Sequence, residues 1–253
     1  MVKQYLGSLH KYRSVDSIHT ESIITQQELF FSKSDRFNDP FEIKPIFKMP
    51  SYSEMNEMSN RILGPLYNEE QLKRTYQNLL SMPKEQALGP ITETISQLIR
   101  KHRYCCFCME NDNILLYSYY ANNHNGICFS FNPKLDKKLL GAAFEVDYTD
   151  STRRIEFDIY KVINGSLDSF YLNFTKSIIW KHENEVRVMK LSPQEKYNFK
   201  KEALEEVIFG CNVDQKDKDK YIRLLNDNGF DHVKIGHARI SNSLYKLTIE
   251  YSD

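Results

Sequence analysis

The chain has 253 residues, 41% of them hydrophobic, and its 34 basic side chains balance its 34 acidic ones. This length suits one large or two small globular domains. The charge balance excludes the strong overall field that draws proteins onto nucleic acids or anionic membranes. No apolar run approaches the roughly 20 residues of a membrane span, and the first residues lack the apolar core of a signal peptide, so we expect a cytoplasmic protein.

The first hundred residues predict two strands followed by helices. Residues 9–13 have the pattern of a strand, residues 14–26 that of a helix capped by Asp16 or Ser17, and residues 28–32 that of a second strand. Turn-forming residues follow. Three helical stretches then run from about residue 53 to 101, with breaks expected at 64–65, 83 and 89–90. We therefore expect a single domain, residues 1–253, that contains a helical insertion or lid at residues 51–101.

The rest of the chain is rich in strands. The predicted strands are residues 104–108, 127–131, 144–148, 185–191, 207–209, 232–235 and 244–251. The predicted helices are residues 113–123, 152–163, 166–179 and 214–228. Strands and helices do not alternate regularly, so the pattern favours an α+β fold with a mixed, mostly antiparallel or split sheet over a doubly wound parallel sheet.

Four of the five cysteines fall in apolar runs that are predicted to be strands. These are Cys105, Cys106, Cys108 and Cys128. A free cysteine in such a run behaves as a small hydrophobic residue. We interpret them as buried thiols and assign no metal site to them.

Three charged residues alternate near the start of the strand predicted at residues 185–191. With a side-chain period of two, Glu183, Glu185 and Arg187 share one face, while Val186 and Val188 point to the opposite face and the core. Such a row is either a solvated set of ion pairs, worth under about 1 kcal/mol, or the floor of a site.

Two other strands carry polar candidates for a site. On the first strand Tyr12 and Arg13 point to opposite faces, and an arginine fork can clamp a phosphate. On the second, Ser32 and Ser34 share one face and lead into a polar loop. An exposed arginine at a strand end is the more common case, so Arg13 alone carries little weight.

The polar loop, residues 37–42, has the sequence Phe-Asn-Asp-Pro-Phe-Glu. Asn38 and Asp39 precede a proline and are ordinary turn formers, but a rigid loop of this kind can also hold a ribose or a carboxamide. Its two phenylalanines resemble anchors, so we expect a partly buried loop whose Asp39 or Glu42 carboxylate bonds backbone amides or Arg13.

The predicted helix at 113–123 carries several tyrosines and ends in a polar, glycine-stopped turn. Tyr120 offers a stacking surface for a flat ring, although aromatic residues on helices usually belong to the core. His124, just past the helix, is equally well explained as a partner of the helix dipole or as a ligand contact.

Taken together, these motifs resemble the DUF2971 family, a bacterial domain of unknown function. The resemblance covers nearly the whole chain outside the helical segment. It rests on residues 11–14, 31–32, 37–42 and 120–126, together with Lys176, Trp180, Glu183, Glu185 and Arg187. The family pattern has Trp and His where this chain has Tyr117 and Tyr119, which argues against a catalytic role for either position.

The order of the motifs is also similar to that of ADP-ribosyltransferases of the Arg-Ser-Glu type. A basic residue on the first strand, a Ser-x-Ser and a Glu-x-Glu correspond here to Arg13, residues 32–34 and residues 183–185. The resemblance implies that NAD is the substrate and that ADP-ribose passes to an unknown macromolecular acceptor. It suggests a toxin or phage-defence effector, with an antitoxin or regulatory protein as a further partner.

Under this interpretation Glu185 stabilises the ribosyl cation and grips a ribose hydroxyl, while Glu183 orients or deprotonates the acceptor. Arg13 binds the diphosphate, Ser32 braces the glutamate or the ribose, and Tyr120 packs on nicotinamide. Further expected contacts to NAD come from Tyr12, Ser34, Asn38, Asp39 and His124.

Two other interpretations stay open. One is a metal-dependent phosphodiesterase or nuclease, in which carboxylates hold Mg²⁺. Its candidate residues are Asp39, Glu42, Glu183, Glu185 and His124. The other is a non-catalytic binding module in which these polar groups only cap and pair.

Overall fold

An eight-stranded sheet forms the centre of the protein. The computed structural model describes residues 2–63, 68–149, 153–163 and 170–252. In spatial order the strands are β14 (Leu247–Tyr251), β13 (Lys234–Ile240), β12 (Leu204–Phe209), β5 (Gly126–Phe131), β1 (Leu9–Ser14), β4 (Arg103–Cys108), β10 (Glu185–Lys190) and β6 (Ala143–Glu145). Among the described strand pairs of this sheet, only β12 and β13 run parallel. The predicted α+β fold with a mostly antiparallel sheet is confirmed.

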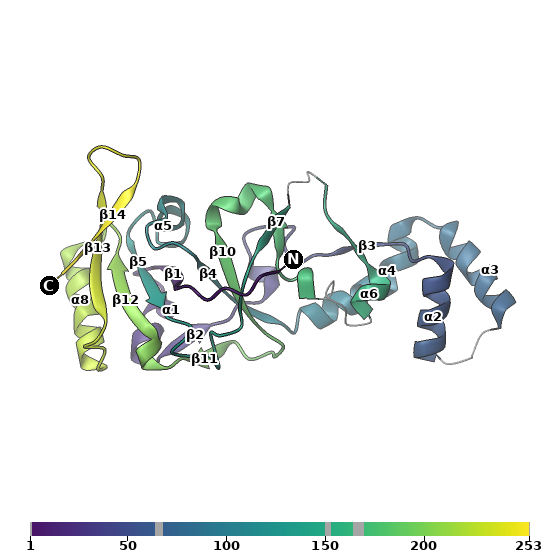
Figure 1. The fold of residues 1–253 in the computed structure, drawn as a ribbon, viewed down its shortest axis with the longest axis horizontal. Coiled ribbons are helices and arrows are strands. Elements are labelled where there is room, and N and C mark those ends of the chain that lie inside the picture. Colours follow the sequence, from purple (N-terminus) through teal and green to yellow (C-terminus); the bar gives the residue numbers. More distant parts are fainter. Residues whose placement is uncertain (1, 64–67, 150–152, 164–169, 253) are drawn as a thin grey trace.

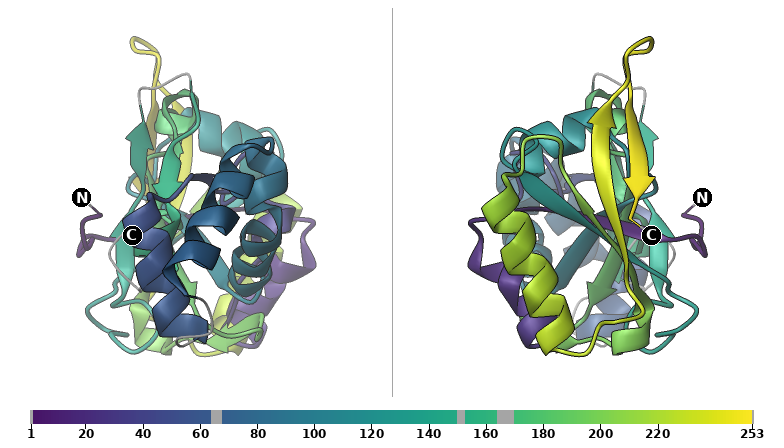
Figure 2. Two further views of the ribbon diagram at one scale, coloured as in Figure 1. Left: turned by 90° about the vertical axis from the view of Figure 1, so that its right-hand side faces the viewer. Right: turned by 90° about the vertical axis from the view of Figure 1, so that its left-hand side faces the viewer.

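Helices cover both faces of this sheet. On one face, α1 (Ile18–Thr25) and α8 (Gln215–Asp227) pack on apolar side chains such as Phe129 and Val186. On the other, α5 (Ile114–Tyr120) packs on Tyr12 and Cys128. Figure 2 shows α8 lying alongside the strands. Alternate side chains of the strands thus point to opposite faces of the sheet, as the sequence predicted. Burial of apolar side chains on both faces is the main term that stabilises the fold.

The sheet splits between β1 and β4. These neighbours share a single register pair, His10 with Cys108, whereas β10 pairs with β4 along its whole length. At the other end of β4, Ser32 takes the place of β1, and two backbone hydrogen bonds of 2.8 and 2.9 Å join it to Tyr104. Between these points the backbone of β4 has no strand on this side. The opening is where a cavity forms.

Ser32 and Ser34 were predicted to share a strand face, but the structure contradicts this. β2 (Glu28–Phe30) ends before Ser32, and Ser34 begins a short 3-10 helix, η1 (Ser34–Arg36). The turn breaks the two-residue alternation, so their side chains have no common strand face.

Four short strands were missed by the sequence patterns: β3 (Ile46–Lys48), β8 (Glu156–Asp158), β9 (Thr175–Ser177) and β11 (Lys196–Asn198). β11 pairs with β2, β3 pairs with β8, and β9 pairs with β7 (Asp147–Thr149). β2 lies within the strand predicted at 28–32, and β7 overlaps the end of the one predicted at 144–148. A three-residue strand is too short to show a period, and its partner lies far away in sequence.

Two predicted helices are therefore largely wrong. The segment 152–163 contains β8 before the short helix α6 (Ile159–Ile163), and the described part of 166–179 contains β9 and the start of a 3-10 helix, η2 (Ile178–Glu183). Residues 164–169 lie outside the described residues. A further 3-10 helix, η3 (Lys201–Ala203), leads into β12.

The predicted helical segment forms an arm at one end of the molecule (Figure 1). It consists of α2 (Tyr52–Leu63), α3 (Glu69–Leu80) and α4 (Lys84–Ile99). The break expected at 64–65 lies outside the described residues, and Pro83 precedes α4 as expected. The break expected at 89–90 is absent, because α4 continues through Pro90. Gly89 has no Cβ to collide with the proline ring, which removes part of the usual penalty.

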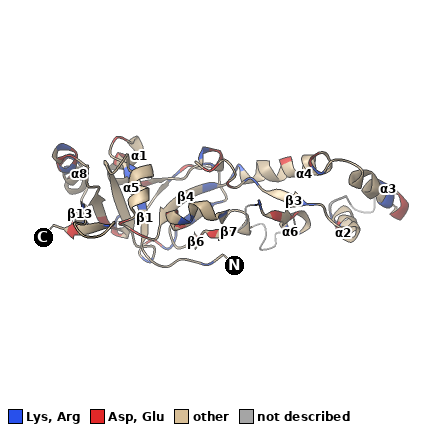
Figure 3. Cartoon of the chain, turned by 90° about the horizontal axis from the view of Figure 1, so that it is seen from above, with Lys and Arg blue, Asp and Glu red and all other residues tan. Residues whose placement is uncertain are grey.

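None of the described helices is long and apolar enough to cross a membrane. Basic and acidic residues are both distributed along the molecule (Figure 3).

Candidate functional site

A cavity of about 300 Å³ occupies the split in the sheet. One wall comes from β1 and the other from β4, with further residues from α1, α5, the 37–42 loop and η2. The lining residues are His10, Lys11, Tyr12, Arg13, His19, Phe30, Ser32, Arg36, Phe37, Asn38, Glu42, Tyr104, Cys106, Phe107, Cys108, Leu116, Tyr120, Lys176, Glu183 and Glu185. Its volume lies at the small end of the range for ligand pockets.

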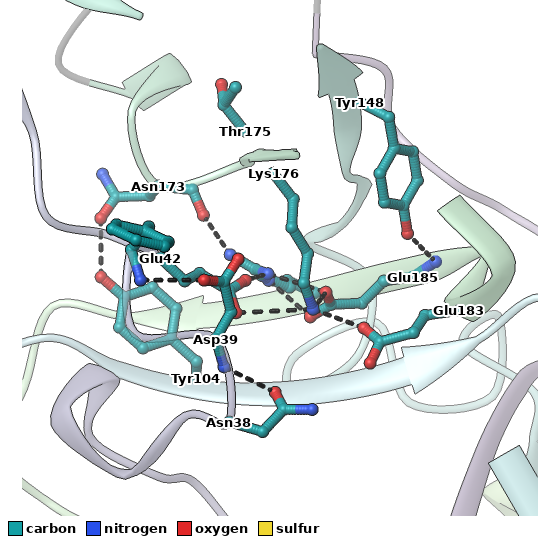
Figure 4. Close-up of polar contacts among 12 residues, drawn as sticks. Asn38, Asp39, Glu42, Tyr104, Tyr148, Asn173, Thr175, Lys176, Glu183 and Glu185 are labelled. Carbon is teal, nitrogen blue, oxygen red and sulfur yellow. Dashed lines mark hydrogen bonds and ion pairs between the residues drawn. The ribbon is translucent and has the colours of Figure 1, made fainter. Parts of the chain in front are cut away.

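One end of the cavity is a buried network of charges (Figure 4). On β10, Arg187 grips Glu185 with two hydrogen bonds, Nε to Oε1 at 2.6 Å and Nη2 to Oε2 at 2.7 Å. Arg187 also pairs with Glu42 from the loop and donates to the backbone oxygen of Asn173 at 2.9 Å. Burial of so many charges is tolerated only because each is paired.

Lys176 reaches into the middle of this network from β9. Its Nζ lies 3.1 Å from Glu185 Oε2 and 3.4 Å from Glu42 Oε2, and it forms a closer ion pair with Glu183. The ammonium also lies 5.1 Å from the centre of the Trp180 ring. Three carboxylates from three separate segments therefore meet one ammonium group.

Glu183 reaches the network from a turn rather than from the strand. It is the last residue of η2, and Asn184 follows with φ of 41° before β10 begins. Asparagine is among the residues that adopt this left-handed conformation most readily. The prediction that Glu183 continues the strand face of Glu185 is wrong, but the turn still brings the two carboxylates to the same lysine.

A chain of hydrogen bonds links Glu183 to the polar loop. Tyr120 donates its hydroxyl to Glu183 Oε1 at 2.6 Å and accepts from Asn38 Nδ2 at 2.8 Å. Asn38 and Tyr120, both predicted as contacts to NAD, thus lie beside Glu183. Because all three residues line the cavity, their side chains are placed to bind hydroxyl or amide groups of a ligand.

Burial shifts the titration of several groups in the network. Burial opposes the charged form of Lys176, but Glu185 and Glu183 outweigh it and raise its pKa. Burial raises the pKa of Glu185, partly offset by Lys176. The pKa values of Cys106 and Tyr120 are also raised, chiefly by burial and then by the neighbouring glutamate. Strong shifts of this kind gather at functional sites more often than elsewhere.

The other end of the cavity is cationic. Lys11 Nζ crosses the split and donates to the backbone oxygen of Cys106 at 2.8 Å. The Nε atom of Arg13 is buried and has no hydrogen-bond partner in the described part of the chain. Burial lowers the pKa of both side chains, and no carboxylate contributes to either shift. Arg36 and His19 line the cavity near this end.

Most of the predicted site residues meet at this cavity. Arg13, Ser32 and Glu185, which come from distant segments, all line it, as the sequence predicted, and Tyr12 joins them. The Tyr12 hydroxyl, however, donates to the backbone oxygen of Glu110 at 2.7 Å, so this residue is mainly part of the core.

Three predicted residues lie elsewhere. Ser34 is not among the lining residues, and His124 stacks on Tyr117 with ring centres 5.9 Å apart. Asp39 accepts a hydrogen bond from the Phe41 amide at 2.8 Å, which confirms the predicted loop turn, and it lines a second cavity beyond Glu42.

Only one of the two phenylalanines predicted to anchor the 37–42 loop does so. Phe37 packs edge-on against Tyr104, whereas Phe41 is 65% exposed and anchors nothing in this way. Glu42 pairs with Arg187 and Lys176 rather than with Arg13.

Sequence reasoning missed Lys11 and Lys176 as site residues. Lys11 shares the strand face of Arg13, so the two-residue period could have found it. Lys176 lies in a segment predicted to be helical, and no local pattern places it beside the glutamates.

Comparisons with known proteins do not classify the chain, because no family model, no curated protein and no solved structure matches it.

Proposed function

We propose that the cavity binds NAD and that the protein transfers its ADP-ribose group to an acceptor. The observation that carries the proposal is the separation of charge within one cavity. Two cations that have no carboxylate partner among the described residues, the buried Lys11 and the half-buried Arg13, lie at one end, and a carboxylate network with an excess of negative charge lies at the other. NAD has the complementary arrangement, with an anionic diphosphate and a cationic nicotinamide ring joined through ribose.

The cationic end favours an anionic ligand. A buried charge is costly unless it is paired, and Arg13 Nε has no hydrogen-bond acceptor among the described residues. A diphosphate would supply acceptors to Arg13 and a counter-charge to Lys11. An arginine binds phosphate oxygens through two parallel hydrogen bonds, which adds geometric selectivity.

The acidic end suits the bond that must break. Cleavage between ribose C1′ and the pyridinium nitrogen sends both bonding electrons to nicotinamide, which leaves as a neutral molecule. The ribose becomes an oxocarbenium-like cation that a nearby carboxylate stabilises. The acceptor then bonds to C1′ and loses a proton.

The contacts suggest a division of labour between the two glutamates. Glu185 is enclosed by Arg187, Lys176 and a hydrogen bond from Cys106. Glu183 has one lysine and the Tyr120 hydroxyl, and Tyr120 is 38% exposed. We therefore assign the ribose-facing role to Glu183 and a supporting electrostatic role to Glu185, which reverses the order suggested by the motif alone.

A non-catalytic binding module is the second candidate. The observation that favours it is the pairing of Glu183 and Glu185 with Lys176, which neutralises part of the charge that catalysis would use. The metal-dependent alternative receives less support. Lys176 Nζ occupies the space between three of its candidate carboxylates, and the described residues hold no group of three side chains suited to a metal ion.

The test combines binding and turnover. Thermal unfolding is followed with NAD, ADP-ribose, ADP and MgCl₂ in separate samples, because a ligand that binds only the folded state must raise its stability. Release of nicotinamide from NAD is followed by chromatography. The proposal expects stabilisation by NAD and ADP, and nicotinamide release. Stabilisation without release supports the binding module, and stabilisation by Mg²⁺ alone supports the metal-dependent alternative.

A further inference from the structure

We propose that Lys176 is a positioning residue that keeps Glu183 and Glu185 ionised side by side and holds Glu183 at the cavity wall. Its consequence for catalysis rests on the proposed function, but its effect on the two carboxylates does not. The lysine would act through the glutamates and need not touch the reacting atoms.

The position of the ammonium group carries this inference. Nζ is within ion-pair distance of Glu42, Glu183 and Glu185, and the side chains of all four residues are at most 5% exposed. Without a cation between them, two buried carboxylates at such short range cannot both stay ionised, and one takes up a proton. The same logic applies to any pair of acids that shares one site.

A count of the charges shows why one lysine matters. Glu42, Glu183 and Glu185 contribute three negative charges, and Lys176 and Arg187 contribute two positive ones, which leaves one negative charge in excess among these five residues. Asp39, which faces Arg187, lies outside this count. Loss of Lys176 would raise the negative excess by one in the same buried volume.

Other titratable groups that face the network do not replace the lysine. They are Asp39 from the loop, Cys106 and Cys108 from β4, Tyr120 from α5 and Tyr148 from β7. None of these can carry a positive charge, and within the described residues the cations paired with the three glutamates are Lys176 and Arg187.

The protein contains its own reporter of this group. Trp180 is the sole tryptophan in the sequence, and its ring lies 5.1 Å from the Lys176 ammonium. A change of charge beside an indole ring changes its fluorescence. The titration of the network is therefore readable without NAD and without any activity.

The experiment records Trp180 emission from pH 3 to pH 9 for the wild type, Lys176→Met and Lys176→Arg, with circular dichroism as a check on folding. All three also carry His182→Gln, because an imidazole 6.0 Å from the Trp180 ring would itself change the emission. We expect the midpoint pH of the acid transition in Trp180 emission to be higher in Lys176→Met than in the wild type by about one pH unit or more, which is the usual effect of one charge at close range. Lys176→Arg should titrate close to the wild type. Lys201→Met is the matched control, because Lys201 also lies over an aromatic ring, Phe230, at 5.2 Å.

A transition in Lys176→Met within about 0.3 pH units of the wild type would overturn the proposal. If Lys176→Met does not fold, the double variant Lys176→Met/Glu183→Gln decides, because it removes one negative charge together with the lysine. The proposal expects the double variant to be more stable than the single one, and equal or lower stability contradicts it.

If the protein cleaves NAD, the pH at which the rate falls on the acid side of its profile should be higher in Lys176→Met than in the wild type. In Lys176→Arg this pH should return to the wild-type value. If no variant and no wild type cleaves NAD, the proposed function fails, while the fluorescence titration still tests the role of Lys176.

Discussion

Glu185 and Arg187, two residues apart on β10, form a bidentate ion pair in which Arg187 Nε lies 2.6 Å from Glu185 Oε1 and Nη2 lies 2.7 Å from Oε2. The pair lies in the core, with Arg187 fully buried. Breaking one member of a buried pair leaves the other charge without compensation. The relationship therefore makes Glu185 a structural residue as well as a candidate for catalysis.

Replacement of Glu185 by Gln should destabilise the fold. The variant removes the excess negative charge of the network, but the Gln amide nitrogen then faces the N–H donors of Arg187 and breaks the bidentate pair. We expect a loss of about 1 to 3 kcal/mol in the free energy of unfolding, the usual cost of a buried donor left without an acceptor. Urea unfolding measures it. Glu250→Gln is the control, since Glu250 pairs with Arg239 on an exposed surface at 3.1 Å, where less than about 1 kcal/mol is expected. Equal losses in the two variants would contradict the argument.

Replacement of Arg13 by Met should have the opposite effect on stability. Removing a half-buried charge whose buried Nε has no partner in the described part of the chain should leave the free protein as stable as the wild type or more stable. Binding of ADP, measured by calorimetry, should weaken about tenfold or more, which is about 1.4 kcal/mol. Arg100→Met, at an exposed ion pair with Glu93, serves as the control and should bind ADP normally. A strongly destabilised Arg13→Met protein would show that Arg13 has a structural partner.

Replacement of Glu183 by Gln tests the catalytic assignment. The variant keeps the shape of the side chain but removes the charge that faces the ribose, so release of nicotinamide should fall by about 100-fold or more. NAD binding should survive, because the cationic end is unchanged. Glu145→Gln is the control, since Glu145 forms an ion pair with Lys3 outside the cavity. Full turnover in Glu183→Gln would return the role to Glu185.

The buried His10 predicts a loss of stability in acid. Burial lowers the pKa of His10 to about 4, and its ring nitrogen Nδ1 lies 2.9 Å from Ser130 Oγ. Between pH 4 and 6.5 the unfolded chain binds a proton that the folded protein does not, so stability falls as pH falls through this window. Across this window the free energy of unfolding should fall by on the order of 3 kcal/mol because of His10.

Unfolding by urea at several pH values checks this expectation by comparing the wild type with His10→Gln. The variant should lose less stability than the wild type between pH 6.5 and 4. His232→Gln, at an exposed site, should follow the wild type. Parallel curves for the wild type and His10→Gln would rule out His10 as the source.

Local sequence patterns were sufficient for the larger elements. The alternation in β1 and β10 placed Tyr12 and Arg13 on opposite faces and sent Val186 and Val188 into the core, because side chains in a strand alternate whatever their partners are. The periodic pattern of α8 and the burial of Cys105, Cys108 and Cys128 were likewise readable from the residues alone. Cys106, also predicted to be buried, is only half-buried because it lines the cavity.

The sequence by itself therefore determined the fold class and most of the candidate residues, because burial and side-chain period are local properties. Only the tertiary structure decided where the sheet splits, that Lys176 lies among the glutamates and that His124 lies away from them. These relationships depend on contacts between distant segments, such as Ser32 with Tyr104, and no local pattern specifies the partner of a three-residue strand or the reach of one lysine.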